Sequence, residues 1–269
     1  MSRIEKKFEA LKQTDRTALV TFIMANDPDY ENALAVLKAM PEAGADIIEI
    51  GMPFSDPAAD GPTIQLAGQR ALAAGANMHK TMEMVREFRK DNNHTPIILM
   101  GYANPLYAYG LEAFAKDASD AGVDGLIIVD LPPEEDSPFR KFSDQYGLDM
   151  IRLITPTTDE DRMKIVLDGA SGFLYYVSIT GVTGTAKADL DAIKPHINTI
   201  KTKTDLPVAI GFGIKTPDDA KEMSALGDAV VVGSSIVDRV KDMQAGGEGL
   251  NHVLSLVNGL SDVLGKRPN

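Results

Sequence analysis

Short, nearly continuous apolar runs recur along the chain, and longer stretches with helix-like spacing of apolar and polar residues separate them. Eight such runs are present, at residues 18–25, 46–52, 96–102, 125–131, 149–155, 173–180, 207–212 and 229–233. Runs that are apolar throughout are typical of parallel strands covered by helices. Eight alternating units within 269 residues predict an α/β fold, a single (β/α)8 TIM barrel, rather than an open doubly wound sheet.

The ends and connections of the chain refine this prediction. Ile4, Phe8 and Leu11 share one helical face, which indicates an extra N-terminal helix. No linker or change of composition divides the chain, so residues 1–269 are expected to form one domain. The connections after the second and sixth runs are longer than the rest. We expect the added length in loops around residues 56–61 and 181–187, on the face where barrel active sites lie.

Charge and composition narrow the classes of partner. The formal net charge is −12, from 27 basic and 39 acidic residues, which argues against a nucleic acid or an anionic membrane as partner. The absence of cysteine excludes disulfides and thiolate chemistry. The N-terminal stretch lacks the apolar core of a secretory signal, and no run has the length of a membrane span, so a cytoplasmic location is expected.

Metal chemistry is not expected either. The four histidines, His79, His94, His196 and His252, fall in helical or loop stretches without the spacing of metal ligands. Each is interpreted as a surface residue.

The most informative segment lies at residues 48–65. Glu49 stands in the middle of an apolar strand, where a carboxylate is disfavoured, and Asp60 follows in a glycine- and proline-containing loop. Two carboxylates in different surroundings can form an acid/base pair. The alternation that turns Glu49 inward also turns Ile47 and Gly51 inward, so burial should raise the pKa of Glu49.

The same alternation predicts an apolar and partly aromatic wall around this carboxylate. The other side chains expected to face inward are Phe22, Met24, Met100, Tyr102, Ile127, Val129, Leu153, Tyr175 and Phe212.

Glycine-bearing segments follow the last three strands and predict a phosphate site. They begin at Gly181, Gly211 and Gly233, and they contain the backbone amides expected to hold the anion. The candidate phosphate residues are Gly184, Gly213, Gly233 and Ser234.

The segment Glu-Ile-Gly-Met-Pro-Phe-Ser-Asp-Pro-Ala-Ala-Asp-Gly-Pro-Thr-Ile-Gln resembles the signature of the tryptophan synthase alpha subunit family. Residues 101–107, 173–184, 207–214 and 232–237 resemble further segments of that family, so the likeness runs from Phe22 to Val237. Ala58 departs from it, because the family usually carries a larger aliphatic residue there. This departure puts the packing of the second loop and its coupling to a partner in question.

The resemblance implies retro-aldol cleavage of indole-3-glycerol phosphate to indole and glyceraldehyde 3-phosphate. Glu49 would move protons between indole C3 and the side-chain hydroxyl, and Asp60 would face the indole nitrogen. Tyr175 and Thr183 would support the loops. The implied substrate-binding residues are Phe22, Ile64, Tyr102, Leu153 and Phe212.

The resemblance also implies a partner. Asp56, Pro57, Asn104 and Pro105 would lie on a rim that docks a beta subunit in an alpha–beta–beta–alpha complex. No cofactor is expected in this chain, since pyridoxal phosphate would belong to the beta subunit.

Two alternatives stay open. A barrel aldolase with a Schiff-base lysine would need a lysine inside a strand, but the one cation there, Arg152, has outward parity. A barrel that only binds and activates another subunit is the second alternative. Asp130 has outward parity beside Val129 and is interpreted as a cap or loop anchor.

Overall fold

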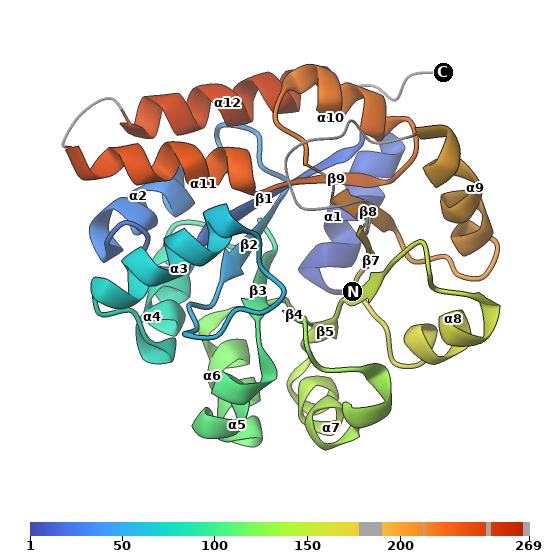
Figure 1. Ribbon diagram of the computed structural model, residues 1–269, viewed down its shortest axis with the longest axis horizontal. Coiled ribbons are helices and arrows are strands. Elements are labelled where there is room, and N and C mark those ends of the chain that lie inside the picture. Colours follow the sequence, from blue (N-terminus) through green and yellow to red (C-terminus); the bar gives the residue numbers. More distant parts are fainter. Residues whose placement is uncertain (178–189, 212, 246–248, 266–269) are drawn as a thin grey trace.

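A computed structural model describes residues 1–177, 190–211, 213–245 and 249–265. Its parallel strands curve into a barrel with the helices on the outside, as Figure 1 shows. The strands are β1 Ala18–Met24, β2 Ile47–Gly51, β3 Ile97–Gly101, β4 Gly125–Ile128, β5 Asp149–Met150, β6 Arg152–Ile154, β7 Leu174–Val177, β8 Val208–Gly211 and β9 Ala229–Val232. The helices are α1 Arg3–Gln13, α2 Tyr30–Ala39, α3 Pro62–Ala73, α4 Met78–Arg89, α5 Ala103–Tyr109, α6 Leu111–Ala121, α7 Ser137–Tyr146, α8 Glu160–Leu167, α9 Leu190–Lys201, α10 Pro217–Ser224, α11 Ser234–Val240 and α12 Gly249–Val263.

The nine strand segments correspond to the eight predicted strands. Their order in the sheet is β5-β4-β3-β2-β1-β9-β8-β7-β6. Only Ile151 separates β5 from β6, so the two edge segments belong to one stretch of chain, and that stretch closes the ring. The prediction of a TIM barrel is confirmed.

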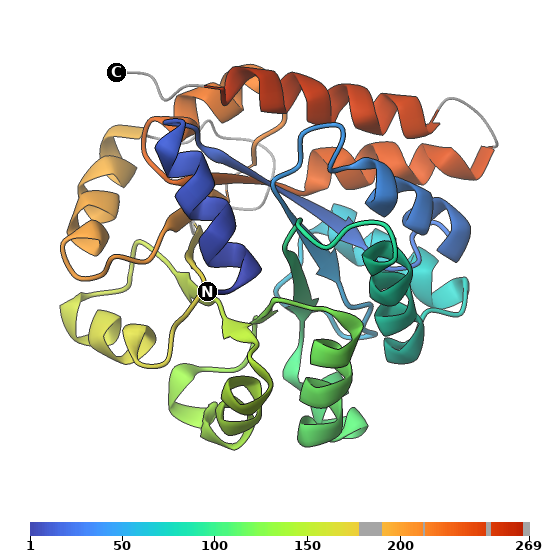
Figure 2. The ribbon, with the colours of Figure 1, turned by 180° about the vertical axis from the view of Figure 1, so that it is seen from behind.

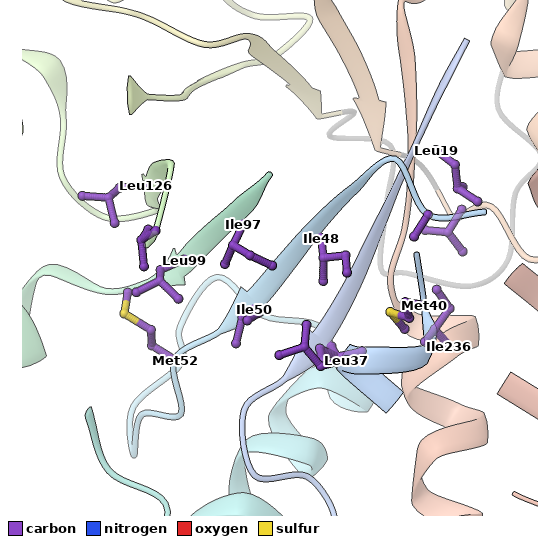
Figure 3. Packing of buried hydrophobic residues seen from close by; sticks show 14 of the residues in the cluster. Leu19, Leu37, Met40, Ile48, Ile50, Met52, Ile97, Leu99, Leu126 and Ile236 are labelled. Atoms are coloured by element: carbon purple, nitrogen blue, oxygen red, sulfur yellow. The ribbon is translucent and has the colours of Figure 1, made fainter. Parts of the chain in front are cut away.

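Alternation along the strands builds two layers of core. Ile48 and Ile50 of β2 point outward into the layer between sheet and helices, which Figure 3 shows. Ile47, of the opposite parity, packs inside the barrel with residues such as Val20 and Ile98. Because the parity of Ile47 is also that of Glu49, the strand that builds the core directs the carboxylate inward.

Helix α1 covers the N-terminal end of the barrel, as Figure 2 shows from behind. Ser2 caps the helix in a capping box with Glu5. Ile4, Phe8 and Leu11 join the apolar cluster inside the barrel, so the predicted N-terminal helix is confirmed. This end is therefore plugged, and access to the interior is left to the opposite face.

Polar side chains that precede alternate strands join those strands to their predecessors. Asp46 accepts the N–H of Leu19 at 3.0 Å, and Asp124 accepts that of Ile97 at 2.8 Å. In the same way, Ser171 accepts the N–H of Met150 at 2.8 Å, and Asp228 accepts the N–H of Val208 at 3.0 Å. Each bond satisfies a strand N–H that would otherwise be buried without a partner.

The connection between β2 and β3 corrects the sequence analysis. We expected its added length mainly in a loop, but residues 52–61 form the loop and two helices, α3 and α4, follow it. Amphipathic spacing in α4, with Met82, Val85 and Phe88 buried, accounts for the second helix. The other proposed loop, around residues 181–187, lies outside the described residues.

Across the described residues, none of the helices has both the length and the apolar character that crossing a membrane requires.

Candidate active site

A cavity of about 370 Å³ opens at the C-terminal ends of the strands. Phe22, Glu49 and Tyr175 line it from the barrel interior, and Asp60 lines it from the loop after β2. The loops after β8 and β9 form the opposite wall with Gly213 and the segment 233–234. The structure therefore brings together residues from widely separated strands, including both predicted carboxylates.

A larger groove, of about 750 Å³, lies at the opposite end of the barrel beside α1. Its lining includes Arg3 and Asp124, which form an ion pair at 2.8 Å, and exposed residues such as His94. None of the predicted site residues lines this groove.

Glu49 lies at the centre of β2 with 0% of its surface exposed. Both carboxyl oxygens are buried without a hydrogen-bond partner among the described residues. Burial raises the pKa of Glu49 from 4.5 to about 8. The expected rise in pKa is confirmed, and the carboxyl group is protonated at neutral pH. No described neighbour forms a hydrogen bond with it.

Gly51 leaves room for the ring of Phe22 in the wall of the cavity. It shares the inward parity of Glu49, and a Cβ added at Gly51 would lie 2.5 Å from the ring of Phe22. Any larger residue would push that ring out of its place in the wall.

Asp60 occupies the loop before α3 and is partly exposed. Burial raises the pKa of its carboxyl group, and a hydrogen bond with Tyr102 opposes that rise. The phenol oxygen of Tyr102 also accepts the N–H of Ala59 at 3.0 Å. Tyr102, immediately after β3, therefore anchors the loop that carries Asp60.

Tyr175 of β7 lies close to Glu49. Burial, and secondly the charge of Glu49, raises the pKa of the Tyr175 phenol well above 10. Strand β7 pairs with β8, which ends at Gly211. A Cβ at Gly211 would lie 2.4 Å from the Tyr175 hydroxyl. The absence of a side chain at Gly211 thus leaves room for the phenol in the cavity.

Three of the four predicted phosphate-binding residues lie together at one end of the cavity. Gly213, Gly233 and Ser234 all line the cavity. The backbone of Gly213 has a φ of +34°, a conformation that glycine adopts without strain. Gly184, Thr183 and Phe212 lie outside the described residues.

The remaining substrate-binding candidates lie at different places. Ile64 lines the cavity from α3. Tyr102 lines a small adjoining space with Phe22 and Asp60. Leu153 packs inside the barrel but lines a neighbouring cavity, of about 460 Å³, below the loops after β4 and β6. Its contact with substrate stays a prediction.

Some residues that line the cavity were absent from the predicted site. They are Ala59, Gly61, Pro62, Thr63, Met100, Gly211, Ile214, Lys215, Val231 and Asp238. Met100 had been assigned to the inward wall, and several others are chain neighbours of Asp60 or Gly213. Lys215 and Asp238 had no signal in the sequence, because only the fold brings the loop after β8 and helix α11 to the cavity.

Lysine and metal chemistry receive no support from the described residues. The described strands contain no lysine, and the strand cation Arg152 points outward, where it pairs with the buried Asp136. Lys215 at the cavity mouth is exposed, whereas a Schiff-base lysine needs desolvation. No group of three or more acidic or histidine side chains in the described regions could hold a metal ion. All four histidines are exposed, as predicted.

The predicted rim lies beside the cavity. Asp56 and Asn104 are exposed, and Pro57 and Pro105 are partly exposed. The loop after β2 and helix α5 are held together there, since the rings of Phe54 and Tyr102 lie 5.4 Å apart. Asp130 accepts the N–H of Ala103 at 2.7 Å, so its interpretation as a loop anchor is confirmed.

Comparison with known proteins identifies the family. The family model described as tryptophan synthase alpha chain matches residues 8–262. The chain belongs to the tryptophan synthase alpha chain family. Members of this family are lyases that act on indole-3-glycerol phosphate, and they catalyse the alpha reaction of tryptophan synthesis.

Solved structures agree with this assignment. A crystal structure of tryptophan synthase subunit alpha from Legionella pneumophila str. Paris is 38% identical, with a TM-score of 0.92 and 98% of each chain covered. An alpha chain from Legionella pneumophila subsp. pneumophila is 38% identical, with a TM-score of 0.90 and coverage of 98% and 97%. Tryptophan synthase from M. tuberculosis, in an open form with BRD0059 bound, is 30% identical, with a TM-score of 0.88 and coverage of 99% and 100%.

Proposed function

We propose that this chain cleaves indole-3-glycerol phosphate through acid/base catalysis by Glu49 and Asp60. The observation that carries the proposal is the cavity that contains both carboxyl groups in unlike environments. Glu49 is completely buried and protonated at neutral pH, whereas Asp60 is partly exposed and bonded to Tyr102. Unlike environments suit the two carboxyl groups to different roles, a proton carrier at Glu49 and a stabilising charge at Asp60.

Glu49 would act first as the acid. Its carboxyl proton passes to indole C3, which makes the ring cationic and weakens the bond from C3 to the glycerol side chain. The carboxylate that remains then accepts the proton of the hydroxyl on the adjacent carbon, as that carbon becomes the aldehyde and the C3 bond breaks. The bonding electrons return to the ring, and Glu49 regains its proton, so the cycle is balanced.

Asp60 would stabilise the cationic ring. An ionised carboxylate beside the indole N–H accepts that hydrogen bond more strongly as the ring becomes positive. The glycine backbone at Gly213 and Gly233, with Ser234, would hold the phosphate at the other end of the cavity.

We infer further that the rim of Asp56, Pro57, Asn104 and Pro105 docks a beta subunit in an alpha–beta–beta–alpha complex. These residues are accessible and lie at the cavity face. The pyridoxal phosphate of the complete reaction would belong to that partner, and this chain would need no cofactor of its own.

The direct test adds indole-3-glycerol phosphate to the purified chain and follows glyceraldehyde 3-phosphate, with and without a beta subunit. We expect slow turnover alone and faster turnover with the partner. Glu49→Gln and Asp60→Asn should both abolish turnover while the far-ultraviolet circular dichroism stays unchanged. Asp56→Asn is a matched change in the same loop as Asp60. It should leave the turnover of the isolated chain, without a beta subunit, unchanged. Near-normal turnover by either catalytic variant would refute the assigned roles.

A further inference from the structure

The cavity wall carries an unbalanced set of charges. Its ionisable lining residues are Glu49, Asp60, Asp238 and Lys215, together with the phenol of Tyr175. Among the described residues that line the cavity, Lys215 alone carries a positive charge. A phosphorylated substrate brings about two further negative charges into this acidic site. Backbone amides hold an anion locally, but they leave the repulsion from nearby carboxylates in place.

Lys215 has a fixed backbone and a side chain free to reach the anion. It follows Gly213 and Ile214, and its N–H donates to Asp219 at 3.1 Å. The next N–H, of Thr216, donates to the same carboxylate at 3.0 Å in the capping box of α10. The base of the side chain is therefore held rigidly beside the glycine segment.

The Lys215 side chain is exposed and forms no ion pair within the described part of the chain. Asp238, another carboxylate of the cavity lining, pairs instead with Lys241 at 3.2 Å. An unpaired ammonium on a flexible stem, at the mouth of a cavity with three carboxyl groups, is available to an incoming anion.

We propose that Lys215 is a substrate-binding residue that recognises the phosphate group and offsets the acidic charge of the cavity. The inference rests on the proposed function, since it takes the cavity to be the substrate site. Lys215 acts through charge on both ground state and transition state, so it lowers KM and leaves kcat unchanged. It also makes substrate capture sensitive to salt.

The test is a charge series at one position, Lys215→Arg, Lys215→Gln and Lys215→Glu. Loss of the charge in the Gln variant should raise KM for indole-3-glycerol phosphate about tenfold, with kcat unchanged, and the Glu variant should raise it further. The Arg variant should retain the wild-type KM. The Gln variant should also lose most of the dependence of KM on ionic strength. Lys221→Gln, an exposed lysine of α10 that does not line the cavity, is the matched control.

The reverse reaction separates phosphate recognition from a general disturbance of the site. In the Gln variant, KM for glyceraldehyde 3-phosphate should rise while KM for indole stays constant. Equal changes for both, or no change for either, overturn the proposal.

Calorimetric binding of inorganic phosphate tests Lys215 without turnover. Wild-type protein should bind it about tenfold more tightly than Lys215→Gln. If folded wild-type protein produces no glyceraldehyde 3-phosphate, the proposed function fails, and the phosphate result still decides the role of Lys215. Equal binding by the two proteins, or no binding by either, overturns that role.

Discussion

Tyr102, which directly follows the neighbouring strand β3, holds the loop of Asp60 in place. Its phenol accepts the N–H of Ala59 at 3.0 Å and hydrogen-bonds the carboxyl group of Asp60, although these residues lie on connections after different strands. The proximity of Asp60, after the effect of burial, raises the pKa of Tyr102 to about 12, so Tyr102 keeps its proton throughout the neutral range. The aromatic residue thus has an electrostatic role beside its place in the wall.

Tyr102→Phe should therefore change the pH dependence of catalysis. The hydrogen bond lowers the pKa of Asp60 against the effect of burial, and its loss lets that pKa rise further. Because the proposed mechanism needs ionised Asp60, the acidic limb of kcat/KM against pH should move to higher pH. Tyr107→Phe, an exposed tyrosine of α5, is the control for the isolated chain. An unmoved acidic limb would contradict this role of Tyr102.

Glu49→Gln should gain stability relative to wild type as pH rises. The folded-state pKa of Glu49, about 8, lies above its ordinary value of 4.5. Between these values the folded state holds a proton that the unfolded state has released, so wild-type stability falls with pH by about 1.4 kcal/mol per unit at most. Glutamine does not titrate, and the variant escapes this loss. The expected result is a difference in unfolding free energy that grows from about pH 5 to pH 8.

Urea unfolding of both proteins across this range gives the measurement. Glu9→Gln, an exposed change on α1, should follow wild type at every pH. A constant difference between Glu49→Gln and wild type would show that Glu49 is ionised or solvated in the folded protein.

Asp124→Ala should destabilise the barrel strongly without touching the chemistry. Asp124 accepts the N–H of Ile97 and pairs with Arg89 at 2.7 Å and with Arg3 at 2.8 Å. Removal leaves the buried Arg89 guanidinium without its counter-charge, which costs about 3–5 kcal/mol. Asp91→Ala breaks an exposed pair with Lys38 and should cost less than about 1 kcal/mol.

The two variants are compared by the midpoint of urea unfolding and by turnover below that midpoint. Because Asp124 lies at the N-terminal end of the barrel, the folded fraction of the variant should keep wild-type turnover. A loss of stability no greater than that of Asp91→Ala would contradict the role assigned to the buried pair.

Ala58→Leu should strengthen the complex with a beta subunit. Ala58 is exposed in the rim loop, so a larger side chain there meets solvent in the isolated chain and needs no repacking. If the partner covers it, the added apolar surface contributes up to about 2 kcal/mol to binding. Titration of the partner, read by the rise in turnover, measures the change. Unaltered or weaker binding would place Ala58 outside the interface.

The barrel and the direction of Glu49 were both predicted from local patterns, the barrel from eight recurring apolar runs and Glu49 from strand alternation. Strand alternation is local, so the pattern of Ile47, Glu49 and Gly51 could be assigned without knowing any neighbour. The loop after the second strand was predicted less well. Its length was visible, but the helical spacing of Met82, Val85 and Phe88 had to be recognised before α4 could be separated from a loop.

The sequence by itself determined the eight strand–helix units, the plugging face of α1 and the identity of the two carboxyl residues, because periodicity and residue chemistry are properties of neighbouring positions. Only the tertiary structure decided that Tyr102 anchors the loop of Asp60, that Lys215 reaches the cavity mouth and that Leu153 lines a separate cavity. Those relationships depend on closure of the ring. Closure sets the register between strands and brings their C-terminal loops to one face, and no local pattern encodes those distances.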